Sequence, residues 1–253
     1  MRITIIKKRN YRGLQKLYDN FTVAKNGEVY VAIGGDGTFI RAAQMTDKPL
    51  LFIRDNADDS LGYHSDVSLD DIDFVVKKLK KRDFYVEQIS SKIEIIHKGS
   101  HYYAINEASL NNMVEEISFN IYQKDKTGRS RIYPFIMSGD GAVVTSALGS
   151  TAYNKSAGGP IILAQNVMCI TFLNPDGPYR NPIVVDAKKK IEIEVVKYTG
   201  TLRYDGAEIA RLKPGDRFTV KLSGKKINAV RFRGRSESFA DKLERKIRAR
   251  LLK

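Results

Sequence analysis

The chain has 253 residues, of which 42% are apolar and 28% charged, an ordinary composition for a folded globular protein that argues against a disordered chain. Its 43 Lys and Arg against 29 Asp and Glu give a net charge of +14, so anions are the expected ligands, although charge alone does not choose among nucleotides, polyphosphate, nucleic acids and acidic membranes. The single cysteine, Cys169, excludes an intrachain disulfide and a cysteine-based metal cluster.

The first 88 residues alternate between strand and helix signals. Short apolar runs predict three buried strands, at 2–6, 29–33 and 50–53. Apolar residues at helical spacing predict helices between these strands, at 14–21 and 38–45. A further helix begins at Ser68, because Ser68 and Asp71 have the pattern of a capping box. Strands separated by helices imply a parallel sheet with right-handed crossovers.

From residue 89 onward the apolar period changes to two. Apolar and polar residues alternate around positions 93, 119, 193, 220 and 231, which is typical of half-buried antiparallel strands. A last helix is predicted after Ser238, which forms a second capping-box pattern with Asp241. We therefore expect an α/β domain at 1–88, completed by a helix in 236–253, and a second, mostly β domain at 89–235.

The turn from Gly34 to Thr38 is the first candidate site. Glycines between a strand and a helix let the backbone approach an anion closely, and the helix N-terminus offers unpaired N–H groups to phosphate. Asp36 would repel phosphate unless it binds a metal ion or accepts a proton from a nucleophile, and both roles suit a kinase. The alternative is a tight turn in which Asp36 is only the N-cap of the helix.

Two further segments have the residue types of a nucleotide pocket. The stretch from Asp140 to Pro160 is dense in glycine and hydroxyl residues, which let a ligand lie against backbone amides, with Ser150, Thr151 and Ser156 as hydrogen-bonding partners and Tyr153 as a stacking surface. Its alternative is a long loop between strands. The dipeptide Asn106-Glu107 follows an apolar strand and can hold a ribose diol or an adenine amine, although turn chemistry explains it equally well.

Taken in order and spacing, these three segments resemble the NAD kinase family: Gly-Gly-Asp-Gly-Thr, then Asn-Glu, then Asp-Gly followed by Gly-Ser-Thr-Ala-Tyr and Ser-Ala-Gly-Gly. The resemblance spans most of the chain. It implies a Rossmann-like α/β domain, a mostly antiparallel β-sandwich-like domain, and a C-terminal helix that returns to the first domain. Two segments depart from the family pattern, Ser146-Ala147-Leu148 in place of Thr-Pro-Thr, and Ala207 in place of glutamine after Asp205-Gly206.

The resemblance also implies a role for each matched residue. Asp36 would accept the proton of the 2′-hydroxyl of the NAD adenosine ribose, with Gly37 beside it and Arg41 facing phosphate. Asn106 and Glu107 would hold the adenosine portion of NAD. The remaining implied NAD contacts are Ser138, Asp140, Thr151, Ala152, Tyr153 and Ser156, and in many members the aspartate at the position of Asp140 reaches NAD across a subunit interface.

The partners follow from the same resemblance. ATP, or polyphosphate in some members, would be the phosphoryl donor, with magnesium or another divalent ion, and the protein would form a homodimer or homotetramer. The histidines lack metal-ligand spacing, and His97 and His101 are predicted to face solvent on a hairpin. No apolar run approaches the roughly 20 residues that cross a bilayer, and the N-terminus is too short for a signal peptide, so we expect a cytoplasmic protein without a membrane partner.

Two other functions remain open from the residues. The Gly-Gly-Asp-Gly turn also occurs in related lipid kinases and phosphofructokinases, so a kinase acting on a lipid or a sugar is one alternative. The charge of +14 motivates the other, a nucleic-acid-binding protein whose affinity would fall steeply with salt. No nucleic-acid reader motif is present and aromatic residues do not interleave with the basic runs, so we expect no nucleic-acid partner.

Overall fold

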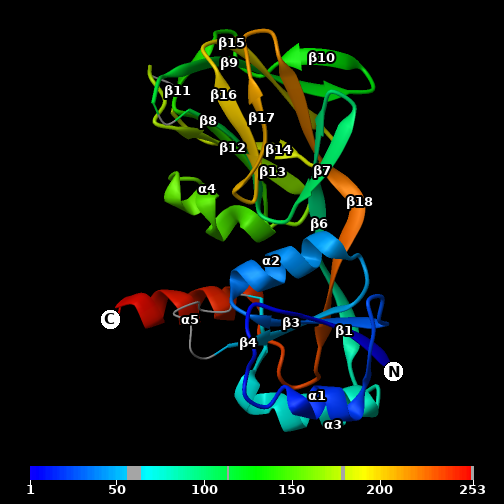
Figure 1. The fold of residues 1–253 in the computed structure, drawn as a ribbon. Helices are drawn as coiled ribbons and strands as arrows, with labels where there is room; N and C mark the ends of the chain where they lie inside the picture. Colours follow the sequence, from blue (N-terminus) through cyan, green and yellow to red (C-terminus); the bar gives the residue numbers. More distant parts are fainter. Residues whose placement is uncertain (56–63, 113, 178–179, 252–253) are drawn as a thin grey trace. The chain divides into compact units, whose positions relative to one another are not determined.

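The structure, a computed structural model, describes residues 1–55, 64–112, 114–177 and 180–251. The chain divides into two compact units (Figure 1): unit 1 contains Met1–Ile89 and Lys226–Lys253, and unit 2 contains Ser90–Lys225. The chain passes from one unit to the other within two long strands, β6 (Tyr85–His97) and β18 (Arg217–Arg231). No helix among the described residues is both long and apolar enough to span a bilayer.

Unit 1 is built on a parallel sheet. Its strands pair in the order β18, β4, β3, β1, β2, and β5 also pairs with β4. Their bounds are β1 Arg2–Lys7, β2 Thr22–Val23, β3 Val29–Gly34, β4 Leu50–Arg54 and β5 Val67–Ser68. All six residues of β3 are buried, as the apolar run at 29–33 predicts for a strand covered on both faces. The predicted parallel sheet is confirmed.

The helical segments of unit 1 lie between these strands, except the last, which follows β18. Their bounds are α1 Gln15–Asn20, α2 Asp36–Met45, the 3-10 turn η1 Leu69–Asp71, α3 Ile72–Lys80 and α5 Phe239–Leu251. The predicted capping box is present, since the Ser68 N–H donates to the Asp71 carboxylate over 2.9 Å. α3 then buries its apolar face, Ile72, Val75, Val76 and Leu79. Helix α2 begins at Asp36 and not at Thr38, because Gly35 is extended and is itself the N-cap.

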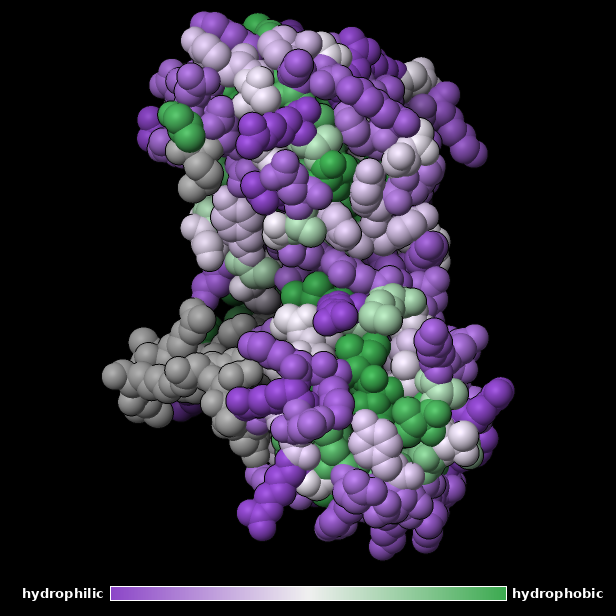
Figure 2. All heavy atoms as spheres, viewed as in Figure 1, coloured by the Kyte–Doolittle hydropathy of each residue, from purple (hydrophilic) through white to green (hydrophobic). Residues whose placement is uncertain are grey.

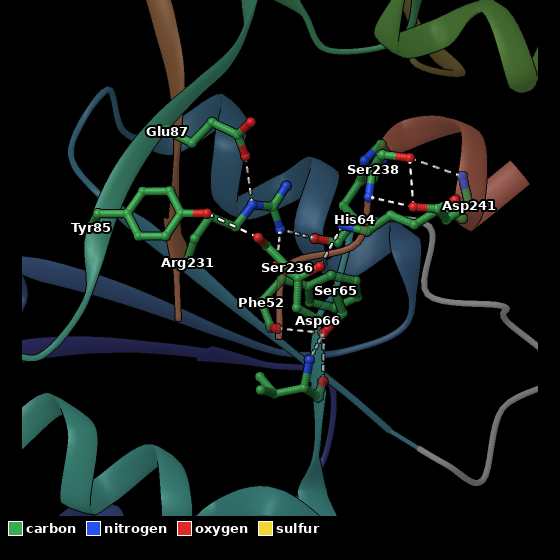
Figure 3. A network of polar contacts seen from close by, with 12 residues as sticks. Phe52, His64, Ser65, Asp66, Tyr85, Glu87, Arg231, Ser236, Ser238 and Asp241 are labelled. Carbon is green, nitrogen blue, oxygen red and sulfur yellow. Dashed lines mark hydrogen bonds and ion pairs between the residues drawn. The ribbon is translucent and has the colours of Figure 1, made fainter. Parts of the chain in front are cut away.

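The C-terminal helix α5 is held by polar contacts within unit 1. Figure 3 shows Ser238 and Asp241 facing each other at its start, where the N–H of Asp241 donates to the Ser238 hydroxyl over 3.2 Å and the N–H of Ser238 donates to the Asp241 carboxylate over 3.2 Å. Farther along the helix, Lys242 is buried against Asp66. The helix therefore returns to the first unit, as the resemblance implied.

Unit 2 contains two antiparallel sheets whose side chains share one core. The smaller sheet has the order β14, β13, β12, β8, β16, β17. Its strands are β8 Glu107–Asn111, β12 Gly141–Ser146, β13 Val167–Leu173, β14 Ile183–Asp186, β16 Gly200–Tyr204 and β17 Ala207–Leu212. The other sheet contains parts of β6 and β18 with β7 Ser100–Ala104, β9 Ile117–Asp125, β10 Gly128–Arg131, β11 Met137–Gly139 and β15 Lys190–Lys197.

A common apolar core joins the two sheets of unit 2. Leu110, Val144 and Phe172 come from the smaller sheet, and Phe119 and Ile193 come from the other. The rings of Phe119 and Phe172 lie 6.5 Å apart between centroids, which is within the range of aromatic contact. The predicted β-sandwich-like domain is thus confirmed. Two short elements, η2 (Leu148–Thr151) and α4 (Tyr153–Ser156), follow β12 at one end of this unit (Figure 1).

The structure differs from two predictions about single positions. The predicted boundary at residue 235 lies inside unit 1, because β18 pairs with β4 and places Val230 and Phe232 in the core of that unit. The prediction that His97 faces solvent is wrong: β6 pairs with β18, so His97 is buried, with its Nδ1 3.0 Å from the Arg217 carbonyl oxygen. Cys169 is buried, and burial raises the pKa of its thiol.

Candidate active site

The Gly34–Thr38 turn joins the buried strand β3 to helix α2. Gly34 has φ +145°, and a Cβ at this position would lie 2.6 Å from the Thr38 hydroxyl oxygen. Thr38 is held there because its N–H donates to the Gly35 carbonyl over 2.9 Å. Glycine at position 34 is therefore required both by conformation and by space.

A cavity of about 520 Å³ lies against this turn, and its volume is typical of small-molecule sites. Its lining residues are Gly35, Asp36, Gly37, Thr38 and Arg41 from the turn and helix, together with Ile6, Lys7 and Lys8. β1 and β3 are parallel neighbours, so the carboxyl ends of both strands meet at one edge of the sheet. Three cationic side chains and one carboxylate face the cavity, and this surplus favours an anionic ligand.

Asp36 is the carboxylate of this cavity. It is half-buried and occupies the first position of α2, close to the positive end of the helix dipole. The alternative reading of Asp36 as the N-cap is wrong, since Gly35 has that position. Gly37 follows it, and a Cβ there would meet nothing within 4 Å. Asp36 thus presents a carboxylate beside an open space, as a general base requires.

Sequence reasoning missed Lys7 and Lys8. A signal was available, because Lys7 ends the apolar strand β1, Lys8 follows it, and neighbouring parallel strands end at the same edge of a sheet. Lys7 also donates to the Asn10 side-chain oxygen over 2.5 Å. Arg41 is exposed on α2. Together these cations add to the phosphate-binding capacity that the turn alone suggested.

In unit 2, Ile105 and Asn106 form a tight turn between β7 and β8, and Glu107 is the first residue of β8. The Asp205 carboxylate accepts hydrogen bonds from three consecutive backbone N–H groups, those of Ile105 over 2.8 Å, Asn106 over 2.8 Å and Glu107 over 3.2 Å. On the other side, the Thr145 hydroxyl donates to the Asn106 carbonyl over 2.8 Å. The turn is therefore fixed by contacts from strand β12 and from the loop between β16 and β17.

Glu107 is the one acidic side chain of this turn, and it is only 7% exposed. Its Oε2 atom is buried and has no hydrogen-bonding partner among the described residues. Burial, and secondly the negative charge of Asp205, raise the pKa of Glu107 to about 7. Buried polar atoms are nearly always hydrogen-bonded in native proteins, so an unsatisfied carboxylate oxygen in a predicted binding turn is a ligand-site signal.

The segment after β12 packs directly on this turn. A Cβ at Gly149 would lie 1.9 Å from the Asn106 carbonyl oxygen, so only glycine permits this approach. Thr151, Ala152 and Tyr153 follow, all half-buried, and Ser156 is exposed. These residues and the Asn106-Glu107 turn thus occupy one region of unit 2.

Ser150 does not have the role that its sequence suggested. It is fully buried, its hydroxyl donates to the Ala147 carbonyl over 2.7 Å, and it accepts the Ile162 N–H over 3.1 Å. Because both its donor and its acceptor are used inside the protein, Ser150 is a structural residue and not a ligand contact. Its position within a run of hydroxyl residues could not reveal this.

Asn154 is a further residue that sequence reasoning missed. It is fully buried; its amide donates to the carbonyl oxygens of Pro160 over 2.9 Å and Ser150 over 3.3 Å, and its side-chain oxygen accepts the Thr171 hydroxyl over 2.6 Å. A Cβ at Gly159 would lie 2.3 Å from that oxygen. Asn154 and Gly159 therefore fold the loop back onto β13.

Asp140 lies in a sharp bend between β11 and β12. The flanking glycines, Gly139 and Gly141, have φ of +146° and +137°. Asp140 itself is half-buried, as is Ser138, whose hydroxyl lies 3.0 Å from that of Ser118. The bend presents the Asp140 side chain at the start of β12.

The two departures from the family pattern have different surroundings. Ala147 packs with Ile162 and Cys169 in a small apolar cluster, and Leu148 is 7% exposed, so this segment contributes to packing. Ala207 is exposed. The predicted site residues fall in both units: Asp36, Gly37 and Arg41 are in unit 1, and the other eight are in unit 2.

Comparison with known proteins gives the family. Residues 77–232 match the family described as the ATP-NAD kinase C-terminal domain, and this match covers more than half of the chain. The chain belongs to the NAD kinase family. Members of the family are kinases, so this chain is a phosphotransferase.

Individual NAD kinases agree with this assignment. The chain is 27% identical over 233 residues to the NAD kinase of Thermoplasma volcanium, covering 88% of this chain and 79% of that protein. It is 28% identical over 218 residues to the NAD kinase of Sulfurimonas denitrificans, covering 79% of this chain and 70% of that protein. Both alignments extend through most of the two units.

Solved NAD kinase structures share the fold. An NAD kinase from Archaeoglobus fulgidus in complex with ATP superposes with a TM-score of 0.77 at 21% identity, covering 98% of this chain and 99% of that one. Yeast NADH kinase complexed with NADH superposes with a TM-score of 0.78 at 17% identity, covering 96% of this chain and 85% of that one. The predicted combination of an α/β domain with a β-sandwich-like domain is the fold of both.

Proposed function

We propose that this chain transfers a phosphoryl group from ATP to the 2′-hydroxyl of the adenosine ribose of NAD, giving NADP. The observation that carries the proposal is the cavity of about 520 Å³ in which one carboxylate, Asp36, lies among the cations Lys7, Lys8 and Arg41. The cations suit the phosphates of a nucleotide, and the carboxylate suits the proton of an attacking hydroxyl.

Asp36 is the proposed general base. The ribose oxygen attacks the terminal phosphorus of ATP, the bond from that phosphorus to the bridging oxygen breaks, and ADP leaves. The hydroxyl proton passes to the Asp36 carboxylate. Phosphoryl transfer of this kind depends mainly on positioning and on neutralising the charge of the transferring oxygens. Lys7, Lys8, Arg41 and the backbone at Gly37 supply the positive groups in this cavity.

A divalent ion fits this arrangement. Among the described residues, no group of three or more His, Cys, Asp or Glu side chains is placed to hold a metal by itself. Magnesium in nucleotide sites is commonly held by one or two carboxylates together with the phosphates of the substrate. Asp36 is the carboxylate that lines the cavity, so magnesium would be bound there together with ATP and would neutralise phosphate charge.

The dinucleotide is assigned to unit 2. Glu107 has an unsatisfied buried oxygen that can accept hydrogen bonds from ribose hydroxyls, and the Asn106 side-chain amide is beside it. Tyr153 offers a half-buried ring for stacking. Thr151, Ala152, Ser156, Ser138 and Asp140 complete the proposed NAD contacts. Because an ionised carboxylate is the better acceptor, NAD affinity is expected to rise as Glu107 loses its proton.

A panel of acceptors and donors tests the proposal. Purified protein with magnesium is given NAD, NADH, a diacylglycerol or a sugar as acceptor, and ATP or polyphosphate as donor. NADP formation from NAD and ATP supports the proposal. Robust transfer to the lipid or the sugar, with none to NAD, would replace it with the related-kinase alternative. Activity with polyphosphate would widen the donor class without changing the acceptor.

The resemblance further leads us to propose a homodimer or homotetramer. The observation in this chain that supports it is the half-buried Asp140 at a sharp bend, the residue for which the family implies contact across a subunit interface. Light scattering on the purified protein measures the mass. A monomer that makes NADP at full rate would remove any catalytic need for assembly.

A further inference from the structure

We infer that Asp205 is a positioning residue of the dinucleotide site, and that its carboxylate holds the Ile105–Glu107 turn in the shape that presents Asn106 and Glu107 to the ligand. The inference rests on the proposed function for the identity of the ligand. The geometry of the turn itself does not depend on that proposal.

The first support is the number of hydrogen bonds that one carboxylate accepts. Oδ1 of Asp205 accepts the N–H groups of Asn106 over 2.8 Å and Glu107 over 3.2 Å, while Oδ2 accepts the N–H of Ile105 over 2.8 Å. Asp205 also donates its own N–H to the Glu107 carbonyl over 3.1 Å. Hydrogen bonds to an ionised acceptor are roughly twice as strong as neutral ones, so this contact fixes three successive residues.

The second support is that the loop containing Asp205 does not need an acidic residue for its own conformation. Asp205 and Gly206 form a two-residue loop between Tyr204 and Ala207, with φ of +45° and +84°. Such a loop accepts Asn-Gly at least as readily as Asp-Gly. The local conformation therefore does not require an acid at position 205, whereas the three backbone N–H groups do.

The third support is position. β16 pairs with β8 so that Tyr204 lies opposite Ala108, which brings the loop beside the residues that begin β8. Among the described residues, Asp205 is the charged group that acts on Glu107, and its charge adds to burial in raising the pKa of Glu107 to about 7. Asp205 thus influences both the position of the Glu107 carboxyl and the pH at which this carboxyl ionises.

Asp205→Asn is the informative variant. Asparagine keeps the favoured turn. Its NH2 group, however, cannot accept a hydrogen bond, so it faces at least one of the backbone N–H groups that donate to the carboxylate in the wild type. Asp216→Asn is the matched control: Asp216 also caps a turn of unit 2, accepting the Lys213 N–H over 2.9 Å and lying 3.0 Å from the Lys98 ammonium. The control removes the same charge from a turn that has no proposed ligand contact.

Three readouts are measured on the wild type and both variants. We expect Asp205→Asn to raise the KM for NAD about tenfold or more, a change that corresponds to the loss of one good interaction, while the KM for ATP stays within about twofold. The pH at which NAD affinity rises should move lower, since the neighbouring negative charge is gone. Hydrogen exchange at the backbone amides of residues 105–107 should become faster, and this readout is measured on the protein without any ligand.

The outcomes distinguish this inference from the proposed function. If the wild type makes no NADP, the proposed function fails, yet faster exchange at 105–107 in Asp205→Asn alone still supports the positioning role. If NADP is made and Asp205→Asn has the NAD affinity, pH profile and exchange rates of the Asp216→Asn control, the inference is overturned. Equal losses toward NAD and ATP would also overturn it, because they would mean general damage to the fold.

Discussion

The ammonium group of Lys242 lies 2.5 Å from the Asp66 carboxylate, and both side chains are about 5% exposed. The other oxygen of Asp66 accepts a hydrogen bond over 2.7 Å from Arg231, which also pairs with Glu87 over 2.8 Å (Figure 3). Burial and the charge of Arg231 lower the pKa of Lys242. One buried carboxylate therefore connects the C-terminal helix α5 to strand β18.

The first prediction is that removing Asp66 lowers the free energy of unfolding more than removing Lys242. Asp66→Asn leaves two buried cations without their shared carboxylate and should lower the free energy of unfolding by about 3–5 kcal/mol. Lys242→Met leaves the Arg231–Asp66 pair intact and should cost less than about 2 kcal/mol. Urea denaturation measures both. Asp73→Asn is the control, since its pair with Lys16 is exposed and should contribute less than about 1 kcal/mol. Equal losses for Asp66→Asn and the control would contradict this account.

The second prediction contrasts two glycines of the same turn. Gly34→Ala places a methyl group 2.6 Å from the Thr38 hydroxyl at a φ of +145°, so it should destabilise the protein by about 1–3 kcal/mol. Gly37→Ala meets nothing within 4 Å and should fold as stably as the wild type. It should still lower activity, because the methyl group faces the cavity. Thermal unfolding and the NADP assay on both variants measure the contrast, and a stable Gly34→Ala would show that the turn can relax.

The strands and helices of unit 1 could be predicted because they depend on local patterns. The apolar run at 29–33 and the capping box at Ser68 each report what a short segment does by itself. The position of β18 could not be predicted in this way. Its last residues alternate like an antiparallel strand, yet they pair in parallel with β4, a partner almost 180 residues earlier in the chain.

The candidate site shows the same division. Asp36 and the glycines around it could be found from a strand, turn and helix in succession. Asp205 could not, because its three hydrogen bonds reach residues about 100 positions away. Ser150 and Asn154 were obscured for a related reason: hydroxyl and amide groups serve ligands and internal contacts equally well, and only the folded contacts separate the two uses.

The third prediction follows from the raised pKa of Glu107. In the unfolded chain this carboxyl ionises near 4.5, whereas in the folded protein it keeps its proton up to about 7. The folded state therefore binds the extra proton between these values, and stability falls as pH rises through this window. Glu107→Gln removes the effect, so its stability relative to the wild type should increase by up to about 3 kcal/mol from pH 4.5 to pH 8. Urea denaturation across this range measures it; a constant difference would contradict the raised pKa.

The fourth prediction concerns the buried Asn154. Asn154→Ala leaves the Thr171 hydroxyl and the Pro160 carbonyl without their partner, which should cost about 2–4 kcal/mol. NAD affinity should fall as well, because the same loop carries Tyr153. The control is Asn166→Ala on the exposed surface of unit 2, which should change stability by less than about 0.5 kcal/mol. Thermal unfolding measures both, and a small effect at Asn154 would mean that the loop does not depend on this amide.

The most direct test of the account is the rate of NADP formation by Asp36→Asn, compared with the wild type at saturating NAD, ATP and magnesium. NAD binding is measured by calorimetry on the same samples. Asparagine preserves size but cannot accept the hydroxyl proton, so we predict a rate loss of about 100-fold to 10,000-fold with NAD affinity nearly unchanged. A variant that makes NADP at close to the wild-type rate would contradict the role of Asp36 as the general base.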